Sequence, residues 1–252
     1  MNENFDLNNY FENITQDDEL FVKCIGDSKS VLDIFDNATK NIINVVENSG
    51  KQDIRTTNIQ ENVKILGNVF IDEGTEIESG SVIQGPVYIG KNCKLMYNSY
   101  IRPGTIMGDN CVVGFSTEVK HTIMRTGSKI SDLAFVGDSV LGKNARVGSG
   151  VIVANRAFSQ SNVIVKDENK NKIDIGREAM GIILGDNSRV GSNATTSPGT
   201  FIGKFSWIYP HTCIHGIVPP QKKVYDKQNL VFVDNERKEL YKATDWNYGK
   251  YI

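Results

Sequence analysis

Aliphatic side chains recur at every sixth position through the middle of the chain. The series consists of Ile59, Ile65, Ile71, Ile77, Ile83, Ile89, Leu95, Ile101, Met107, Val113 and Val119. Six residues turn a helix by about 240°, so these side chains cannot share one helix face. A single strand is excluded as well, because Pro86 and Pro103 would interrupt it. The period instead predicts a parallel β-helix, in which short strands alternate with corners.

A second series with the same period accompanies the first. Small or β-branched residues follow the aliphatic ones by four positions: Val63, Val69, Thr75, Ser81, Val87, Cys93, Ser99, Thr105, Cys111 and Thr117. Such side chains suit interior corners, where successive coils stack at about 4.8 Å. We therefore predict an all-β fold, a parallel β-helix built from hexapeptide repeats.

The period is interrupted twice. It breaks between Lys120 and Arg125 and returns at Val136, Leu141, Val147 and Val153. It breaks again over residues 156–181, after which Leu184, Val190, Thr196, Ile202, Ile208 and Ile214 restore it. Within the second break, NVIVKDENKNKIDI alternates apolar and polar residues around a polar turn, which predicts a projecting β-hairpin.

Both ends of the chain differ from the repeat. Residues between Ser30 and Gly50 show a roughly helical apolar pattern, and we expect this helix to cover the open end of the β-helix. KKVYDKQNLVFVDNERKELY predicts a strand pair closing the last coil. The predicted divisions are an N-terminal helical cap (1–58), a first β-helix part (59–155), an inserted hairpin (156–181), a second β-helix part (182–218) and a C-terminal capping segment (219–252).

Composition and charge indicate which classes of partner the protein does not bind. The formal net charge is −2, and no basic cluster interleaved with aromatic residues appears along the sequence, so we expect no nucleic-acid binding. No apolar run approaches the roughly 18 residues that span a membrane, and the first residues lack a basic segment followed by an apolar one. We expect a cytoplasmic protein that does not bind membranes.

The cysteines and two of the histidines carry no clear metal signature. Cys93 and Cys111 are three hexapeptides apart, so in a three-sided coil they would lie one above the other as small apolar side chains. No CxxC motif or mixed cluster is present. His211 and His215 are four residues apart across a corner instead of on one helix face. We expect no metal and no cofactor required for folding.

Three segments give a more specific indication: YIRPGTIMGDNCVVGFSTEVK, KISDLAFVGDSVLGKNARVGSGVIVAN and GIILGDNSRVGSNATTSPGTFIGKFSWIYP. They resemble the C-terminal acyltransferase domain of sugar-1-phosphate nucleotidylyltransferases, in particular the bifunctional enzymes that make UDP-N-acetylglucosamine. FSTEVK and LAFVGDS lie outside the repeat, so generic hexapeptide similarity does not account for them. The resemblance implies a left-handed β-helix, assembled as a homotrimer with its site between subunits.

The nucleotidyltransferase domain of that family is not expected here. In the relatives it precedes the β-helix and carries a glycine-rich loop after its first strand, whereas residues 1–58 contain no such loop. We expect no nucleotidyl transfer by this chain.

The resemblance assigns part of an acyltransferase site. Arg102 and Lys120 match the family's basic residues that hold the sugar phosphate, and a guanidinium with an ammonium can clamp a phosphate. Asn155 matches a polar site residue near the acyl group, and Glu118 stands where the family also has Glu. These four residues are candidate substrate ligands.

Three positions depart from the family pattern. Asp132 replaces the catalytic histidine, Phe135 a tyrosine and Arg146 an asparagine. Acyl transfer from a thioester needs a base, and an aspartate with a pKa near 3.9 is a weaker base than a histidine near 6.5. His121 follows Lys120 at the first interruption and could act as a relocated base. We expect acetylation of glucosamine 1-phosphate to be weak or absent.

Three functions remain open from the sequence. The first is an acyl-CoA-dependent transferase acting on a phosphorylated sugar or nucleotide-sugar, with acetyl-CoA as a donor and Asp132 or His121 as base; Phe135 and Arg146 would line the substrate. The second is a binding or regulatory β-helix that retains the phosphate cleft without catalysis. The third is a purely structural trimer, which does not explain the basic pair.

Overall fold

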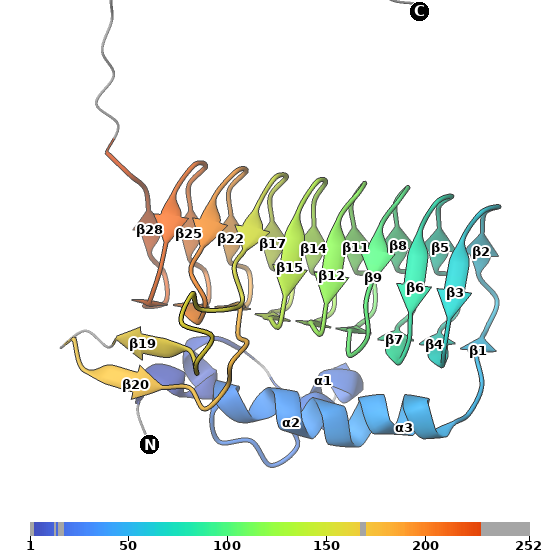
Figure 1. Ribbon diagram of the computed structural model, residues 1–252, viewed down its shortest axis with the longest axis horizontal. Helices are drawn as coiled ribbons and strands as arrows, with labels where there is room; N and C mark the ends of the chain where they lie inside the picture. Colours follow the sequence, from blue (N-terminus) through green and yellow to red (C-terminus); the bar gives the residue numbers. More distant parts are fainter. Residues whose placement is uncertain (1–2, 13, 15–17, 167–169, 228–252) are drawn as a thin grey trace, which may run out of the picture.

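A three-sided parallel β-helix forms the body of the protein (Figure 1). The computed structural model describes residues 3–12, 14, 18–166 and 170–227. Each coil contributes one short strand to each of three parallel sheets, except that the last coil has no described strand in the third, and neighbouring strands in a sheet come from successive coils. The fold class predicted from the six-residue period is confirmed.

The strands are two or three residues long. The first sheet comprises β1 (Asp53–Ile54), β4 (Val69–Ile71), β7 (Val87–Ile89), β10 (Ile106–Met107), β13 (Ile123–Met124), β16 (Val140–Leu141), β21 (Ile182–Leu184), β24 (Thr200–Ile202) and β27 (Ile217–Val218). The second comprises β2 (Asn58–Ile59), β5 (Glu76–Ile77), β8 (Lys94–Leu95), β11 (Val112–Val113), β14 (Lys129–Ile130), β17 (Arg146–Val147), β22 (Arg189–Val190), β25 (Trp207–Ile208) and β28 (Lys223–Val224). The third comprises β3 (Lys64–Leu66), β6 (Val82–Gln84), β9 (Tyr100–Ile101), β12 (Glu118–Lys120), β15 (Phe135–Gly137), β18 (Ile152–Val153), β23 (Thr195–Thr196) and β26 (Cys213–Ile214).

The aliphatic series fills the interior of the coil. Its members from Ile71 to Val119 are buried, and the small residues at the corners, such as Thr75 and Ser81, are buried beside them. Burying one such aliphatic side chain stabilises the fold by about 1.5–3 kcal/mol. Cys93 and Cys111 lie in neighbouring coils as predicted, and a hydrogen bond with Cys111 together with burial raises the pKa of Cys93.

The first interruption of the period is a shortened corner. Val119 and Met124 are five residues apart and both point inward, and Val136 and Leu141 repeat the same step. Glu118 pairs with Phe135, so this coil has one residue fewer than a coil of three full hexapeptides. Met124 and Ile130 are buried as well, which means that the interior column continues without a break.

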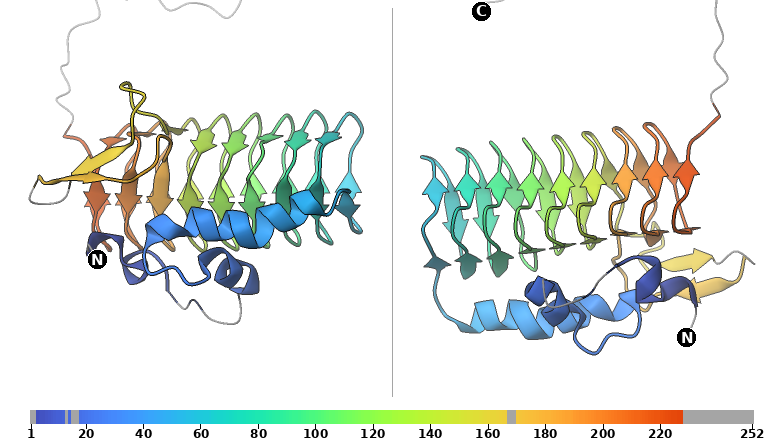
Figure 2. Two further views of the ribbon diagram at one scale, coloured as in Figure 1. Left: turned by 60° about the horizontal axis from the view of Figure 1, so that its bottom comes forward. Right: turned by 180° about the vertical axis from the view of Figure 1, so that it is seen from behind.

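The N-terminal helices lie along the side of the coil (Figure 2). They are the short turns η1 (Glu3–Phe5), η2 (Leu7–Asn9) and η4 (Val31–Asp33), the helix α1 (Glu19–Ile25), and a continuous run of α2 (Ile34–Ala38), η5 (Thr39–Ile43) and α3 (Asn44–Asn48). Their apolar residues pack against outward side chains of the first sheet, including Ile106, Ile123 and Phe201. The helix was expected to cover the open end, and that placement is wrong, because the first sheet offers a longer apolar face.

The remaining predictions for the insertion and the C-terminus have different outcomes. The insertion forms an antiparallel hairpin of β19 (Ile164–Lys166) and β20 (Lys172–Asp174), as expected. It projects beside the last coils and the N-terminal turns (Figure 2). Most of the strand pair predicted after Lys222 falls outside the described residues.

A buried ion network fastens the N-terminal segment to the coil. Arg125 is 2% exposed, and its guanidinium donates to Asp18 at 2.8 Å and to Asp186 at 2.7 Å. The guanidinium also lies over the ring of Phe21 at 4.6 Å. Burial raises the pKa of Asp186, an effect that the charge of Arg125 opposes. Removing Arg125 would leave two carboxylates buried without their cation.

We predict that Arg125→Ala lowers the free energy of unfolding by about 3–5 kcal/mol, the usual cost of breaking a buried ion pair. Urea denaturation followed by circular dichroism measures the change. Lys23→Ala is the control, since Lys23 forms a solvent-exposed pair with Glu19 and exposed pairs contribute little to stability. Similar losses in the two variants would show that the network does not hold the segment.

Candidate functional site

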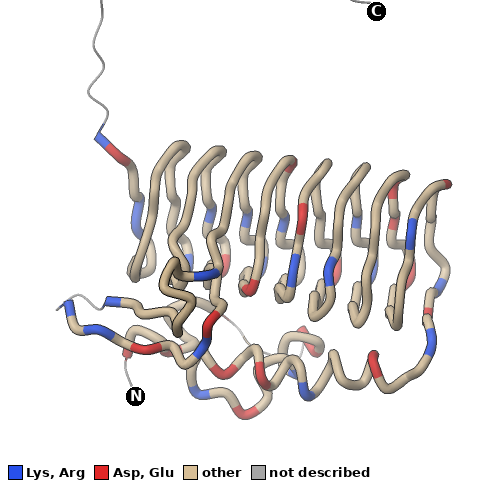
Figure 3. The backbone as a smooth tube through the Cα atoms, in the orientation of Figure 1, with Lys and Arg blue, Asp and Glu red and all other residues tan. Residues whose placement is uncertain are grey.

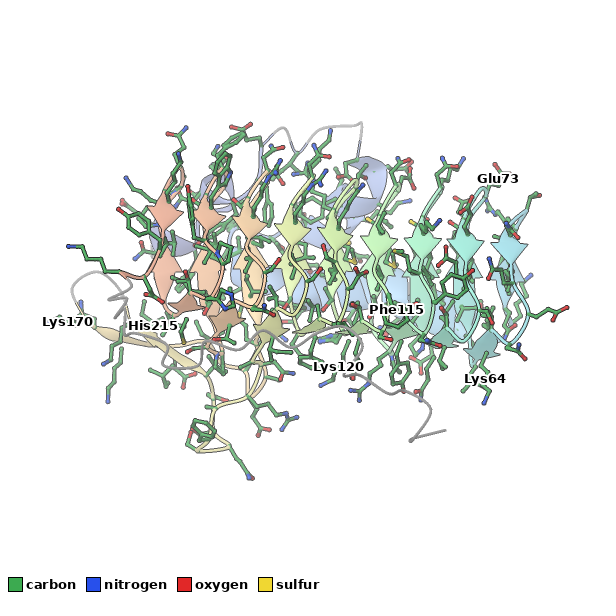
Figure 4. All side chains as sticks on the ribbon, turned by 90° about the horizontal axis from the view of Figure 1, so that it is seen from above. Lys64, Glu73, Phe115, Lys120, Lys170 and His215 are labelled. Atoms are coloured by element: carbon green, nitrogen blue, oxygen red, sulfur yellow. The ribbon has the colours of Figure 1, made fainter. Side chains whose placement is uncertain are left out.

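Two basic side chains stand on adjacent coils at one edge of the third sheet. The backbone N–H of Arg102 donates to the carbonyl of Val119, which places Arg102 beside Lys120 at the inter-strand spacing of about 4.8 Å. Lys120 projects from the same long side of the coil as Lys64, whereas Glu73 lies on the opposite side (Figure 4). The structure thus brings together the two residues that the resemblance assigned to phosphate.

Asp138 is the centre of a polar cluster at this edge. His121 Nδ1 lies 2.9 Å from Asp138 Oδ1, and Lys120 Nζ lies 3.4 Å from Oδ2. The amide of Asn155 also donates to Oδ2. Asp138 is only 6% exposed, and burial acts to raise its pKa. The hydrogen bonds from His121 and Asn155 and the charge of Lys120 outweigh burial and lower the pKa, so Asp138 is ionised at neutral pH.

The shortened corner is what presents His121 to the cluster. His121 adopts a left-handed backbone with φ of 45° at this corner. A Cβ on Gly104, in the coil before, would lie 2.5 Å from His121 Cδ2, so the ring needs glycine there. The imidazole stacks on Phe35 of α2 with ring centroids 5.4 Å apart. Helix and corner together therefore fix the orientation of the ring.

The hairpin insertion also borders the site. Arg177 pairs with Asp36 of α2 at 2.6 Å, and its guanidinium lies over the ring of Phe35 at 5.4 Å. Phe35 thus contacts both Arg177 and His121. The helix and the insertion, which are separate in sequence, are joined at this point.

The geometry suits His121 for proton transfer. An ionised carboxylate accepts a hydrogen bond, so Nδ1 carries the proton toward Asp138 and Nε2 of the neutral ring carries the lone pair. A positioned imidazole of this kind can take a proton from an attacking hydroxyl or amine. The side chain keeps about a third of its surface exposed, which leaves a path to solvent.

Glu118 and Phe135 lie in the middle of the same sheet. They occupy paired positions on β12 and β15. Arg102 Nη1 donates to Glu118 Oε1 at 2.6 Å, and both side chains are more than a third exposed. An exposed pair of this kind contributes at most about 1 kcal/mol, so an anionic ligand can compete for Arg102.

Asp132 and Arg146 lie apart from this cluster. Asp132 precedes β15 and Asp138 follows it, so the two carboxylates lie at opposite ends of that strand. The Asp132 carboxylate accepts the backbone N–H of Phe115 at 2.8 Å and so caps a corner. Arg146 is on the outer face of the second sheet, paired with Lys129 and Arg189. Within one subunit Asp132 and His121 cannot serve the same substrate atom.

Asp138 and Phe35 were not predicted as site residues from the sequence. Asp138 lies within the second shortened corner, in LAFVGDS, and this interruption was the signal available in the sequence. Phe35 gave no signal beyond its helical pattern, because its contact with His121 depends on where the helix lies. His211 and His215 are exposed. The described residues contain no group of three or more side chains that could hold a metal.

Two family descriptions match the chain. Residues 83–173 match the GMPPB C-terminal domain, and residues 178–206 match the hexapeptide repeat of succinyl-transferase. The resemblance predicted from the sequence is confirmed. The chain contains an acyltransferase-like β-helix similar to that of sugar-1-phosphate nucleotidylyltransferase/acetyltransferases, and the matches extend through the corner that holds His121 and Asp138.

Curated relatives show the same relationship. A bifunctional sugar-1-phosphate nucleotidylyltransferase/acetyltransferase of Sulfurisphaera tokodaii is 40% identical over 158 residues, which are 63% of this chain and 39% of the relative. The bifunctional protein GlmU of Methanococcus aeolicus is 37% identical over 207 residues, 82% of this chain and 48% of the relative. The chain spans less than half the length of these two relatives.

Among solved structures, a Francisella novicida UDP-N-acetylglucosamine acyltransferase aligns with a TM-score of 0.43 and 16% sequence identity, over 67% of each chain. Separately, none of the helices in residues 3–227 that the structure describes has the length and apolar character needed to cross a bilayer.

The lowered pKa of Asp138 predicts how this site responds to acid. Because the pKa is lower in the folded state than in the unfolded chain, the ionised carboxylate stabilises the fold above about pH 4. That contribution is lost as the pH falls through the folded-state pKa. The difference in unfolding free energy between wild type and Asp138→Asn should therefore stay constant above about pH 5 and shrink as the pH falls below that value and through the folded-state pKa of Asp138.

Chemical denaturation at a series of pH values measures this difference. Asp27→Asn is the control, since Asp27 is exposed. A difference between wild type and Asp138→Asn that stays constant over the pH range would contradict the assignment of a depressed pKa to Asp138.

Proposed function

We propose that this chain is an acyl-CoA-dependent acyltransferase that acylates a hydroxyl or amine of a phosphorylated sugar, with His121 as the general base. The observation that carries the proposal is the His121–Asp138 pair beside Lys120 and Arg102. A histidine held by a buried carboxylate, next to two cations, combines a proton acceptor with an anion site.

The reaction follows from these groups. Nε2 of His121 takes the proton from the acceptor hydroxyl or amine as its oxygen or nitrogen attacks the thioester carbonyl carbon. The tetrahedral intermediate then collapses, the carbon–sulfur bond breaks, and the thiol leaves with a proton returned by the imidazolium. Asp138 keeps the ring oriented and stabilises its charged form.

The cations and Asn155 would position the substrate. The ammonium of Lys120 would bind the phosphate as a point charge, in place of its contact with Asp138. The planar guanidinium of Arg102 would bind it through paired hydrogen bonds, in place of its contact with Glu118. Asn155 supplies an amide next to the reacting groups. Acyl-CoA provides the activated acyl group as a co-substrate.

One observation favours a second function. The carboxylate of Asp132, at the position of the family's catalytic histidine, is committed to the Phe115 backbone. If His121 does not act as a base, the chain would be a non-catalytic β-helix that binds a phosphorylated sugar through Arg102 and Lys120.

Release of free thiol from acetyl-CoA in the presence of glucosamine 1-phosphate separates the two functions. We predict that His121→Asn lowers kcat about 10²- to 10⁴-fold, the range typical for loss of a general base. Asp138→Asn should lower kcat less, and His215→Asn, an exposed histidine, should leave it unchanged. The KM for unphosphorylated glucosamine should be higher than the KM for glucosamine 1-phosphate.

Two results would contradict this mechanism. Turnover that is indifferent to His121→Asn but lost in Asp132→Asn would make the aspartate the base. A rise in melting temperature with glucosamine 1-phosphate, abolished by Arg102→Ala and accompanied by no thiol release, would favour the binding protein.

We further propose that the chain forms a homotrimer. The first sheet is covered by the helices, so subunits would meet through the other two sides. The corner between the second and third sheets exposes Tyr97, Phe115 and Leu133, and Ile152 is exposed on the third sheet next to it. Burying such a strip favours association of subunits. In the trimer, the corner of a neighbouring subunit would bring that subunit's Asp132 toward the edge that holds His121.

The trimer predicts a mass near three times 28.0 kDa by light scattering at micromolar concentration. Leu133→Glu combined with Phe115→Glu should shift the mass to that of a monomer, because the strip would carry repelling charges. A monomeric mass for the wild type would remove the intersubunit arrangement from the proposal.

A further inference from the structure

The helical layer leaves one end of the first sheet partly uncovered. The outward residues of this sheet form an apolar and aromatic column from Phe70 to Ile217, with one residue from each strand after β1. Ile106 and Ile123 are buried beneath the helices, whereas Phe70 and Tyr88 are only partly buried. The rings of Phe70 and Tyr88 stack with centroids 4.6 Å apart. A partly open aromatic pair therefore remains at the N-terminal end of the column.

A cavity of about 300 Å³ lies over this pair. Residues of α1 border it on one side and residues of η5 and α3 on the other, and β4 and β7 form its floor. Figure 1 shows the helical run passing beneath these two strands. The apolar lining includes Leu20, Ile42, Val45, Val46, Phe70 and Tyr88. Cavities of this size with mainly apolar walls and a few polar groups are typical of small-molecule sites.

The helical run departs from α-helical geometry at the cavity. η5 is a π-helical turn between α2 and α3, and it supplies Asn41 and Ile42 to the lining. Such turns are rare and are frequent at functional sites. The side-chain amide of Asn41 donates to the carbonyl of Lys23 in α1 at 2.9 Å, so the two helical walls are joined directly. The cavity is therefore held open by the fold itself.

Cations predominate among the charged residues at the opening. The exposed lining residues include Lys23, Lys51 and Asp53. Lys51 has no acidic partner in the described part of the chain. Figure 3 shows a basic residue where the chain leaves α3 toward the first coil. Lys23 pairs with Glu19, but both side chains are largely exposed, so the pair is weak. An anionic group at the opening is favoured over a cationic one.

The far side of Tyr88 has the opposite charge. A neighbouring cavity that shares Tyr88 is bordered by Asp72 and Asp109, and burial together with these carboxylates raises the pKa of Tyr88 to about 12. Asp72 already pairs with Arg55 at 3.1 Å, and Asp109 accepts a backbone N–H at 2.8 Å. These carboxylates would repel an anion, so an anionic ligand would place its charge at Lys51 and its apolar part toward Tyr88.

We propose that this cavity binds a medium-chain carboxylic acid. The alkyl chain would lie between the helices over Phe70 and Tyr88, and it would cover Val45, which is 64% exposed. The carboxylate would pair with Lys51. The helices cover the first sheet, so the subunits of the proposed trimer would leave the cavity accessible. The cavity is also separate from the His121 cluster on the third sheet, so this proposal does not depend on acyl transfer.

Isothermal titration calorimetry of the full chain with decanoate tests the proposal. We expect decanoate to bind about tenfold more tightly than decanol or decylamine, the difference expected for one charged hydrogen bond. Lys51→Gln should remove that advantage over decanol. Lys40→Gln is its control, since Lys40 is an exposed lysine of the same helical run outside the lining.

A second pair of variants tests the position of the alkyl chain. Val45→Glu places a carboxylate at the opening and should weaken decanoate binding about tenfold or more. Val22→Glu is the matched control, because Val22 is an exposed valine of α1 that does not line the cavity. Circular dichroism confirms that both variants are folded.

Four results would overturn the proposal. Absence of decanoate binding by the wild type would leave the cavity without this ligand. Equal weakening in Val45→Glu and Val22→Glu would place the binding elsewhere. Decylamine that binds more tightly than decanoate would assign the polar end to the carboxylates beyond Tyr88. Decanol that binds the wild type as tightly as decanoate would show that Lys51 does not select a carboxylate.

Discussion

Hydrogen bonding between successive coils governs the rest of this structure. Because each strand pairs in parallel register with the strand one coil away, every side chain stands directly above its counterpart. Inside the coil this rule selects aliphatic columns and small corner residues. Outside, it turns a spacing of 17 or 18 residues in sequence into contact, which is how Arg102 comes to lie beside Lys120, and Glu118 beside Phe135.

The one departure from regular stacking creates the candidate site. Removing a single residue after Val119, and again after Val136, tightens two successive corners without disturbing the interior. The tightened corners hold His121 above Gly104 and place Asp138 next to it. A full hexapeptide at either corner would add a residue between the strand and these side chains, so the pairing of imidazole and carboxylate depends on the deletion.

The sequence predicted the coil well and the helices poorly. Period and residue size were enough for the interior, the cysteine pair and the hairpin, since each is set by local spacing. The helix position depends on outward residues of the first sheet. Ile106 and Met107, like Ile123 and Met124, are adjacent apolar residues instead of an alternating pair, which is the pattern of a strand covered on both faces. The roles of Asp138 and Phe35 at the site were not predicted for the same reason. Their contacts join segments whose relative position the repeat does not encode.

The first coil is less protected than those that follow. Ile59 and Leu66 are 37% and 52% exposed, and Ile54, Val63 and Ile65 are only partly buried, because the helices run alongside the coil and leave this end open. The outer edge of β1, β2 and β3 has no further strand in the described chain to pair with. Such an edge can template the addition of another polypeptide, and Asp53 and Lys64 place charges there that oppose uncontrolled fibre growth. The same edge is therefore where an engineered extra coil or a fused domain could continue the stack with native backbone geometry.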